Sequence, residues 1–261
     1  MYYLGIDIGS LSCDAVLIDH ENKIMASSVV PTGAQNRIAI ERATQEVFKT
    51  AHITPKDVKA TVSTGYGRDR VEERLAAVTE ITCHARGIRH LLPKTNVLID
   101  IGGQDSKTIR IDDNSLVVDF AMNDKCAAGT GRFLEAMARA LQVDIEELAK
   151  LDHGASGHVT LSSMCTVFAE SEVVSLIADG ISPHEIVHGL NRAIATRILG
   201  LVHRVAPSIN GLSVAMSGGV AHNSGVIRAL SEGLNCEILV PPRPDTVGAL
   251  GAALIARERD S

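Results

Sequence analysis

The chain contains an internal repeat that sets its architecture. Residues 4–19 read LGIDIGSLSCDAVLID and residues 97–112 read VLIDIGGQDSKTIRID, so that Asp7-Ile8-Gly9 aligns with Asp100-Ile101-Gly102. Each copy is an apolar strand, an Asp-x-Gly turn and a second strand with alternating apolar residues, which is the pattern of a β-hairpin. Two copies predict two similar domains, over residues 1–92 and 93–261.

The remaining sequence alternates between helical and strand patterns. A third strand is expected after each hairpin, at 23–30 and 115–120, with further strands at 60–63, 212–216 and 236–240. Apolar residues at helical spacing predict helices at 36–51, 69–91, 129–142, 166–179, 184–206 and 247–257. Asn223 or Ser224 is expected to cap one more helix, which Gly233 would end. This order predicts an α/β fold with mixed sheets, in which the last helix may pack back on the first domain.

Composition excludes several classes of function. A net charge of −6 and an isoelectric point near 5.9 provide no basic surface for nucleic acid. No apolar run approaches the roughly 20 residues that a membrane-spanning helix needs. Met1 leads directly into an expected strand, which leaves no signal peptide, and we therefore expect a cytoplasmic protein without a membrane or nucleic-acid partner.

The glycine turns have a chemistry of their own. Successive backbone N–H groups around a Gly turn form a nest for phosphate, and the neighbouring Asp can hold a hydrated Mg²⁺. A third Gly-rich segment at 217–221 follows a strand and precedes a helix, which suits the nucleoside end of a nucleotide. The sequence contains neither a Walker-type loop nor a dinucleotide fingerprint, so ATP would be bound in another way.

With these turns the chain resembles the superfamily of acetate and sugar kinases, heat-shock chaperones and actin. The resemblance implies two ribonuclease-H-like domains around a nucleotide cleft, with Mg²⁺ held through water by Asp7 and Asp100. It implies these nucleotide-binding residues: Asp7, Gly9, Ser10, Leu11, Ser12, Cys13 and Asp14 in the first turn, Asp100, Gly102, Gly103, Gln104 and Lys107 in the second, and Gly218, Gly219, His222 and Asp245 in the third and last Gly-rich segments. By analogy with the superfamily, Gln104 or Asp105 would orient the attacking water.

Two cysteine segments narrow the resemblance. The stretches 123–133 (NDKCAAGTGRF) and 163–172 (SMCTVFAESE), together with 64–68 and 99–105, resemble the 2-hydroxyacyl-CoA dehydratase activators. The same family includes ATPase subunits of benzoyl-CoA reductase and reductases of double-cubane-cluster proteins. The resemblance implies an ATP-dependent reductase or activator that passes a low-potential electron to a partner iron–sulfur enzyme, with ferredoxin or flavodoxin as its electron donor.

The residues themselves also support a cluster at Cys126 and Cys165. Each is expected at the start of a helix, where N–H donors and the helix dipole stabilise thiolates. A 4Fe-4S cluster takes four thiolates, so two per chain imply a homodimer that shares one cluster. Cys13, Cys83 and Cys236 lack comparable surroundings. Burial of Cys126 and Cys165 as small core residues, or Zn²⁺ shared across a dimer, remain alternatives.

Three positions depart from the activator pattern. A Lys commonly ends the first phosphate turn, where this chain has Asp14, and a Gln is expected at both His222 and Asp245. An anion at Asp14 would weaken or reorient nucleotide binding unless Lys107 compensates. The departures favour a neighbouring branch, one that serves a double-cubane-cluster protein. Two other functions stay open: a small-molecule kinase of the same superfamily, or a nucleotide-dependent regulator, each with structural cysteines.

Overall fold

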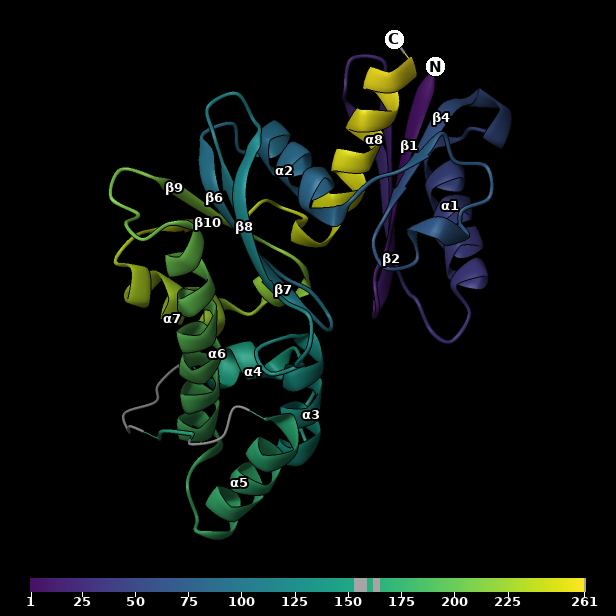
Figure 1. The fold of residues 1–261 in the computed structure, drawn as a ribbon. Helices are drawn as coiled ribbons and strands as arrows, with labels where there is room; N and C mark the ends of the chain where they lie inside the picture. The colour runs from purple at the N-terminus through teal and green to yellow at the C-terminus, as the bar shows by residue number, and fades with distance from the viewer. Residues whose placement is uncertain (153–158, 162–164, 261) are drawn as a thin grey trace. The chain divides into compact units, whose positions relative to one another are not determined.

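The structure is a computed structural model that describes residues 1–152, 159–161 and 165–260 (Figure 1). His153, His158, Ser163 and Met164 lie outside the described residues. The chain forms two compact units. The first contains Met1–Thr95, Ile111–Val118 and the chain from Pro241 onward, and the second contains Asn96–Arg110 and Asp119–Val240.

The first unit is built on a five-stranded mixed sheet with the order β3-β2-β1-β4-β5. Its strands are β1 (Tyr2–Ile8), β2 (Ser12–Asp19), β3 (Ile24–Pro31), β4 (Val58–Thr64) and β5 (Ala76–Ala77). The first three form an antiparallel meander, and β4 runs parallel to β1. Its helices are α1 (Asn36–Ala51), α2 (Glu80–Leu91) and α8 (Val247–Asp260), with 3₁₀ turns η1 (Pro55–Asp57), η2 (Arg68–Arg70) and η4 (Pro244–Thr246).

Alternation along β1 separates two cores. Leu4, Ile6 and Ile8 pack with the buried side chains of α1, whereas Tyr3 lies on the other face, with the buried residues of α8. Gly5 also lies on the α8 face. A Cβ at Gly5 would overlap the Ala249 carbonyl oxygen, so glycine at this position is what lets α8 approach the strand.

The second unit repeats the plan with the strand order β10-β9-β6-β7-β8. Its strands are β6 (Thr95–Ile101), β7 (Ser106–Ile111), β8 (Val117–Asn123), β9 (Ser213–Ser217) and β10 (Ile238–Leu239). Its helices are α3 (Gly131–Leu141), α4 (Glu147–Leu151), α5 (Thr166–Ala178), α6 (Pro183–Val205) and α7 (Ser224–Leu234), with the 3₁₀ turn η3 (Gly219–His222). Among the residues that the structure describes, every helix is too short or too polar to cross a membrane.

The fold class predicted from the sequence, α/β with two mixed sheets, is confirmed. One expected helix is wrong in its first half. Residues 69–91 contain the end of η2, the short strand β5 and only then α2, because β5 pairs with β4 and Thr79 caps the helix by accepting the Thr82 N–H. Gly233 does not end α7, which continues to Leu234 and is followed by Asn235 in the left-handed conformation, with φ of 51°.

Candidate functional site

The two Asp-x-Gly turns have the same local geometry. In the first, the Gly9 N–H donates to the Ser12 carbonyl oxygen at 2.9 Å, and in the second the Gly102 N–H donates to the Asp105 carbonyl oxygen at 3.0 Å. These residues are equivalent in the sequence repeat, so the two turns share the same backbone hydrogen bond as well as the same sequence pattern. Both turns leave their central glycine half-exposed and so open to a ligand.

A glycine from a further strand closes each turn. Gly65 follows β4 and Gly218 follows β9, and both have positive φ angles, 89° and 85°. A Cβ at Gly65 would lie 2.6 Å from Asp7 Oδ1, and a Cβ at Gly218 would lie 3.0 Å from Asp100 Oδ1. Only glycine therefore allows the backbone to lie against each aspartate, and the similarity between the units extends beyond the sequence repeat.

The second turn contains a buried ion triad. Lys107 Nζ lies 2.7 Å from Asp105 Oδ2 and 3.4 Å from Asp100 Oδ2. The Ser217 hydroxyl donates to Asp100 Oδ1 at 2.7 Å, which ties the end of β9 to the same aspartate. The Asp105 carboxylate is thus bound to Lys107, whereas Gln104 at the tip of the turn is exposed.

The first turn has an acidic residue where the second has its lysine. Asp7 faces Asp14 across the hairpin, as Asp100 faces Lys107. Burial raises the pKa of the Asp14 carboxyl well above its usual value, and the charge of Asp7 raises it further. The Ser12 hydroxyl donates to Asp14 Oδ2 at 3.0 Å and partly offsets this shift.

The other residues predicted to bind nucleotide lie in or near these turns. Ser10, Leu11 and Ser12 are half-buried in the first turn, and Gly103 is half-buried in the second. Gly219 and His222 are exposed in η3, and Asp245 is half-buried in η4. The Cys13 side chain lies in the core between the sheet and α1, so any contact that it makes with a nucleotide would come from its backbone.

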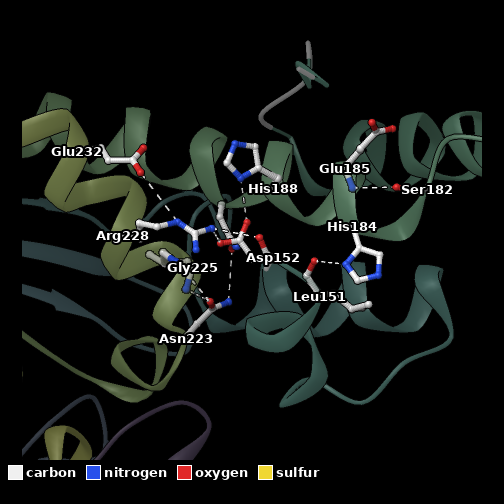
Figure 2. Close-up of polar contacts among 12 residues, drawn as sticks. Leu151, Asp152, Ser182, His184, Glu185, His188, Asn223, Gly225, Arg228 and Glu232 are labelled. Carbon is white, nitrogen blue, oxygen red and sulfur yellow. Dashed lines mark hydrogen bonds and ion pairs between the residues drawn. The ribbon is translucent and has the colours of Figure 1, made fainter. Parts of the chain in front are cut away.

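A polar network that the sequence did not predict joins α4, α6 and α7 (Figure 2). The side chain of Asn223 caps α7 by accepting the Gly225 N–H at 2.9 Å, and its amide lies 3.4 Å from Asn191 Oδ1 on α6. Buried Asp152, at the end of α4, accepts from His188 Nδ1 at 3.0 Å and from Arg228 of α7. The expected cap at Asn223 was the only sequence signal, because Asp152 and its partners come from three distant segments.

The five cysteines are free and fall into two groups. Burial raises the pKa values of Cys13 and Cys83 to about 12, and it also raises that of Cys236. Cys165 is exposed at the N-cap of α5, as predicted, and Cys126 is half-buried. Among the described residues, no three His, Cys, Asp or Glu side chains form a group that could hold a metal ion.

Cys126 differs from its predicted position. It precedes the start of α3 by a turn that includes Gly129, with φ of 84°, and the helix begins at Gly131. The first N–H groups of this helix are already used, since those of Gly131 and Arg132 donate to the carbonyl oxygens of Gly102 and Gly103, both at 2.9 Å. The helix that follows Cys126 is therefore hydrogen-bonded directly to the second Asp-x-Gly turn.

Comparison with known proteins gives a consistent set of relatives. A sequence model described as the BadF/BadG/BcrA/BcrD ATPase family matches residues 4–256. The chain is 46% identical over 260 residues to the activator of lactoyl-CoA dehydratase from Anaerotignum propionicum, which covers 99% of this chain and 98% of that protein. It superposes with a TM-score of 0.93 on the activator of 2-hydroxyisocaproyl-CoA dehydratase from Clostridium difficile with bound ADPNP, at 41% identity and covering 100% of this chain and 96% of that one.

A more distant structure shares the fold alone. A ROK family glucokinase from Streptomyces griseus superposes with a TM-score of 0.58 at 17% identity, covering 99% of this chain and 100% of the glucokinase. The predicted resemblance to 2-hydroxyacyl-CoA dehydratase activators is confirmed.

Proposed function

Because the chain belongs to the BadF/BadG/BcrA/BcrD ATPase family, we propose that it is an activator that uses ATP to drive electron transfer to a partner enzyme. The observation that carries this proposal is the pair of hydrogen bonds from Gly131 and Arg132 to the Gly102–Gly103 turn. They join a turn suited to phosphate to the segment that contains Cys126. These bonds support a direct link between the proposed nucleotide turn and the proposed cluster ligand within the second unit.

We propose that the two Asp-x-Gly turns bind the phosphates of ATP. Each turn has a half-exposed glycine, and we propose that other backbone N–H groups of the turns bind the phosphates while Asp7 and Asp100 hold Mg²⁺ through water. The ADPNP bound by the activator structure from Clostridium difficile supports nucleotide binding by this fold. Gln104 is the better candidate to orient the attacking water, since it is exposed while the Asp105 carboxylate is bound to Lys107.

Cys126 and Cys165 fit a shared 4Fe-4S cluster. Cys165 is exposed and Cys126 is half-buried, in contrast to the buried Cys13 and Cys83. Cys165 occupies the N-cap position of α5, and the dipole of this helix stabilises negative charge at that end. Two thiolates provide half of the four that a cluster needs, so we propose a homodimer with one cluster. When bound, the cluster would supply one electron at low potential.

We propose that nucleotide and cluster are coupled through the second unit. A nucleotide that moves the Gly102–Gly103 turn would pull on the first N–H groups of α3, and Cys126 lies just before that helix. ATP shifts such an equilibrium only through its different affinity for the two arrangements. The partner that we propose is an iron–sulfur dehydratase of 2-hydroxyacyl-CoA substrates or a double-cubane-cluster protein, with ferredoxin or flavodoxin as the donor.

The decisive experiment is an iron and sulfide assay on protein purified without oxygen. We expect about four iron and four sulfide per dimer, together with ATP hydrolysis. Cys126→Ser and Cys165→Ser should each lose the iron, whereas Cys236→Ser, at a half-buried cysteine outside the proposed site, should retain it. Protein that binds no iron even after anaerobic reconstitution would contradict the electron-transfer function. Substrate-stimulated ATP consumption without iron would instead favour a kinase.

A further inference from the structure

Asp7 and Asp14 face each other on adjacent antiparallel strands of the first hairpin. Directly opposed residues have Cβ atoms about 5 Å apart on the same face of the sheet. Asp7 is 7% exposed and Asp14 is 5% exposed. The two carboxyl groups therefore share one buried environment at the first Asp-x-Gly turn.

Asp14 has one oxygen that the protein leaves without a partner. Its Oδ2 accepts the Ser12 hydroxyl at 3.0 Å, but its buried Oδ1 has no hydrogen-bond partner among the described residues. A buried carboxylate oxygen without a partner is costly. A bound cation or a hydrogen-bond donor would stabilise this oxygen.

The second hairpin has a lysine at the position that Asp14 occupies in the first. At the equivalent position, Lys107 places its ammonium 3.4 Å from Asp100 Oδ2, so the cation there is part of the chain. The charged and titratable groups that face Asp14 from other elements are Asp7, Asp245 of η4 and His84 of α2. Two of these three groups are acidic, and His84 is the only basic one among them.

We propose that Asp7 and Asp14 together bind a divalent cation in the position that the Lys107 ammonium has in the second hairpin. Two carboxylates suit Mg²⁺ or Mn²⁺, which are commonly held by one or two carboxylates with water in the remaining positions. The cation would supply to the first hairpin the positive charge that Lys107 supplies to the second. The site stands on the geometry of the first unit, and only its effect on phosphate binding rests on the proposed function.

Mn²⁺ binding to the nucleotide-free protein tests the site. We expect the native chain to bind about one Mn²⁺ that Asp14→Asn and Asp14→Lys weaken at least tenfold, measured by electron paramagnetic resonance of free Mn²⁺. Asp113→Asn, at an exposed aspartate, is the matched control and should bind as the native chain does. Mn²⁺ should raise the thermal unfolding temperature of the native protein but not that of Asp14→Lys, which carries its own cation.

Two results overturn the inference: no Mn²⁺ binding by the nucleotide-free native chain, or the same affinity in both Asp14 variants as in the native chain. If Asp14→Asn fails to fold, Asp14→Lys still provides both measurements, the Mn²⁺ affinity and the effect of Mn²⁺ on the thermal unfolding temperature. ATP binding and hydrolysis by the same preparations are measured separately. A chain that binds Mn²⁺ through Asp14 but neither binds nor hydrolyses ATP would refute the proposed function and leave the cation site intact.

Discussion

Lys107 is the residue on which the second Asp-x-Gly turn depends. It is 3% exposed and lies between the buried carboxylates of Asp100 and Asp105. Removal of one partner from a buried ion pair typically costs about 3–5 kcal/mol, because the remaining charge stays buried. We expect Lys107→Met to lower the free energy of unfolding in urea by about this amount.

The control for this variant is Lys94→Met, at an exposed lysine before β6. A surface change of this kind should alter stability by less than about 0.5 kcal/mol. Equal stability of the two variants would show that Lys107 does not neutralise the turn.

The cysteines should differ in their reactivity towards alkylating reagents, because some are buried and others are exposed. With pKa values of about 12, Cys13 and Cys83 carry on the order of one thiolate in 10⁴ at pH 8, and both are buried. In cluster-free protein, iodoacetamide should therefore modify exposed Cys165 well before either of them, as followed by peptide mass spectrometry. In 8 M urea all five cysteines should react at similar rates. Early labelling of Cys83 in the folded protein would contradict the burial.

The sequence predicts some of these residues and misses others. The Asp-x-Gly turns are local, so a repeat of strand and turn residues reveals them. The neighbours of Asp14 are not local, since His84 and Asp245 come from α2 and η4 and meet Asp14 only through the tertiary fold. The partners of Asp152 are hidden for the same reason.

At the scale of elements, periodicity works where a helix buries one face over several turns. The helix expected at 36–51 has the observed bounds of α1. The same reasoning fails at 69–79, where pairing of β5 with β4 outweighs helical spacing. It also misses α4, because five residues are too few to show a period.

The turn after β9 provides a test with a matched control. Gly218 and Gly211 both have positive φ angles, 85° and 75°, but only Gly218 has close neighbours. Gly211→Ala should therefore cost about 1 kcal/mol from the backbone conformation alone. Gly218→Ala should cost more than this, because the added Cβ would overlap the Ile101 carbonyl oxygen.

Gly218→Ala should also weaken ATP binding, measured by calorimetry, while Gly211→Ala should not. A Gly218→Ala variant that is no less stable than Gly211→Ala would show that the turn relaxes easily around the added methyl group.

The Asp152 side chain joins three helices, α4, α6 and α7, through His188 and Arg228 (Figure 2). Asp152→Ala would leave both donors without this acceptor, and we expect a loss of about 2 kcal/mol in unfolding free energy. Glu232→Gln is the control, since Glu232 lies 3.9 Å from the same arginine on the surface, where such pairs contribute about 0–1 kcal/mol. Equal losses in the two variants would contradict a structural role for the buried carboxylate.

At the scale of the whole molecule, helix α5 exposes apolar side chains that the rest of the single chain does not cover. Its buried residues are Ala169 and Val173, whereas Val167, Phe168 and Val174 are 68%, 67% and 53% exposed. A helix that is apolar on its exposed side is typical of a protein interface. Cys165 caps this helix, so the apolar surface and the proposed cluster ligand occur on the same element.

If the cluster joins two copies of the chain, this surface should be covered in the dimer. We therefore expect Phe168→Glu to convert the iron-containing protein from a dimer towards the 27.7 kDa monomer in sedimentation velocity, since a charge would be buried in an apolar contact. Leu116→Glu is the control, because Leu116 is 62% exposed in the turn between β7 and β8. ATP binding should survive in both variants, as neither residue lies in the turns proposed to hold the phosphates. A Phe168→Glu protein that stays dimeric with its full iron content would place the subunit contact elsewhere and remove the reason for the apolar surface of α5.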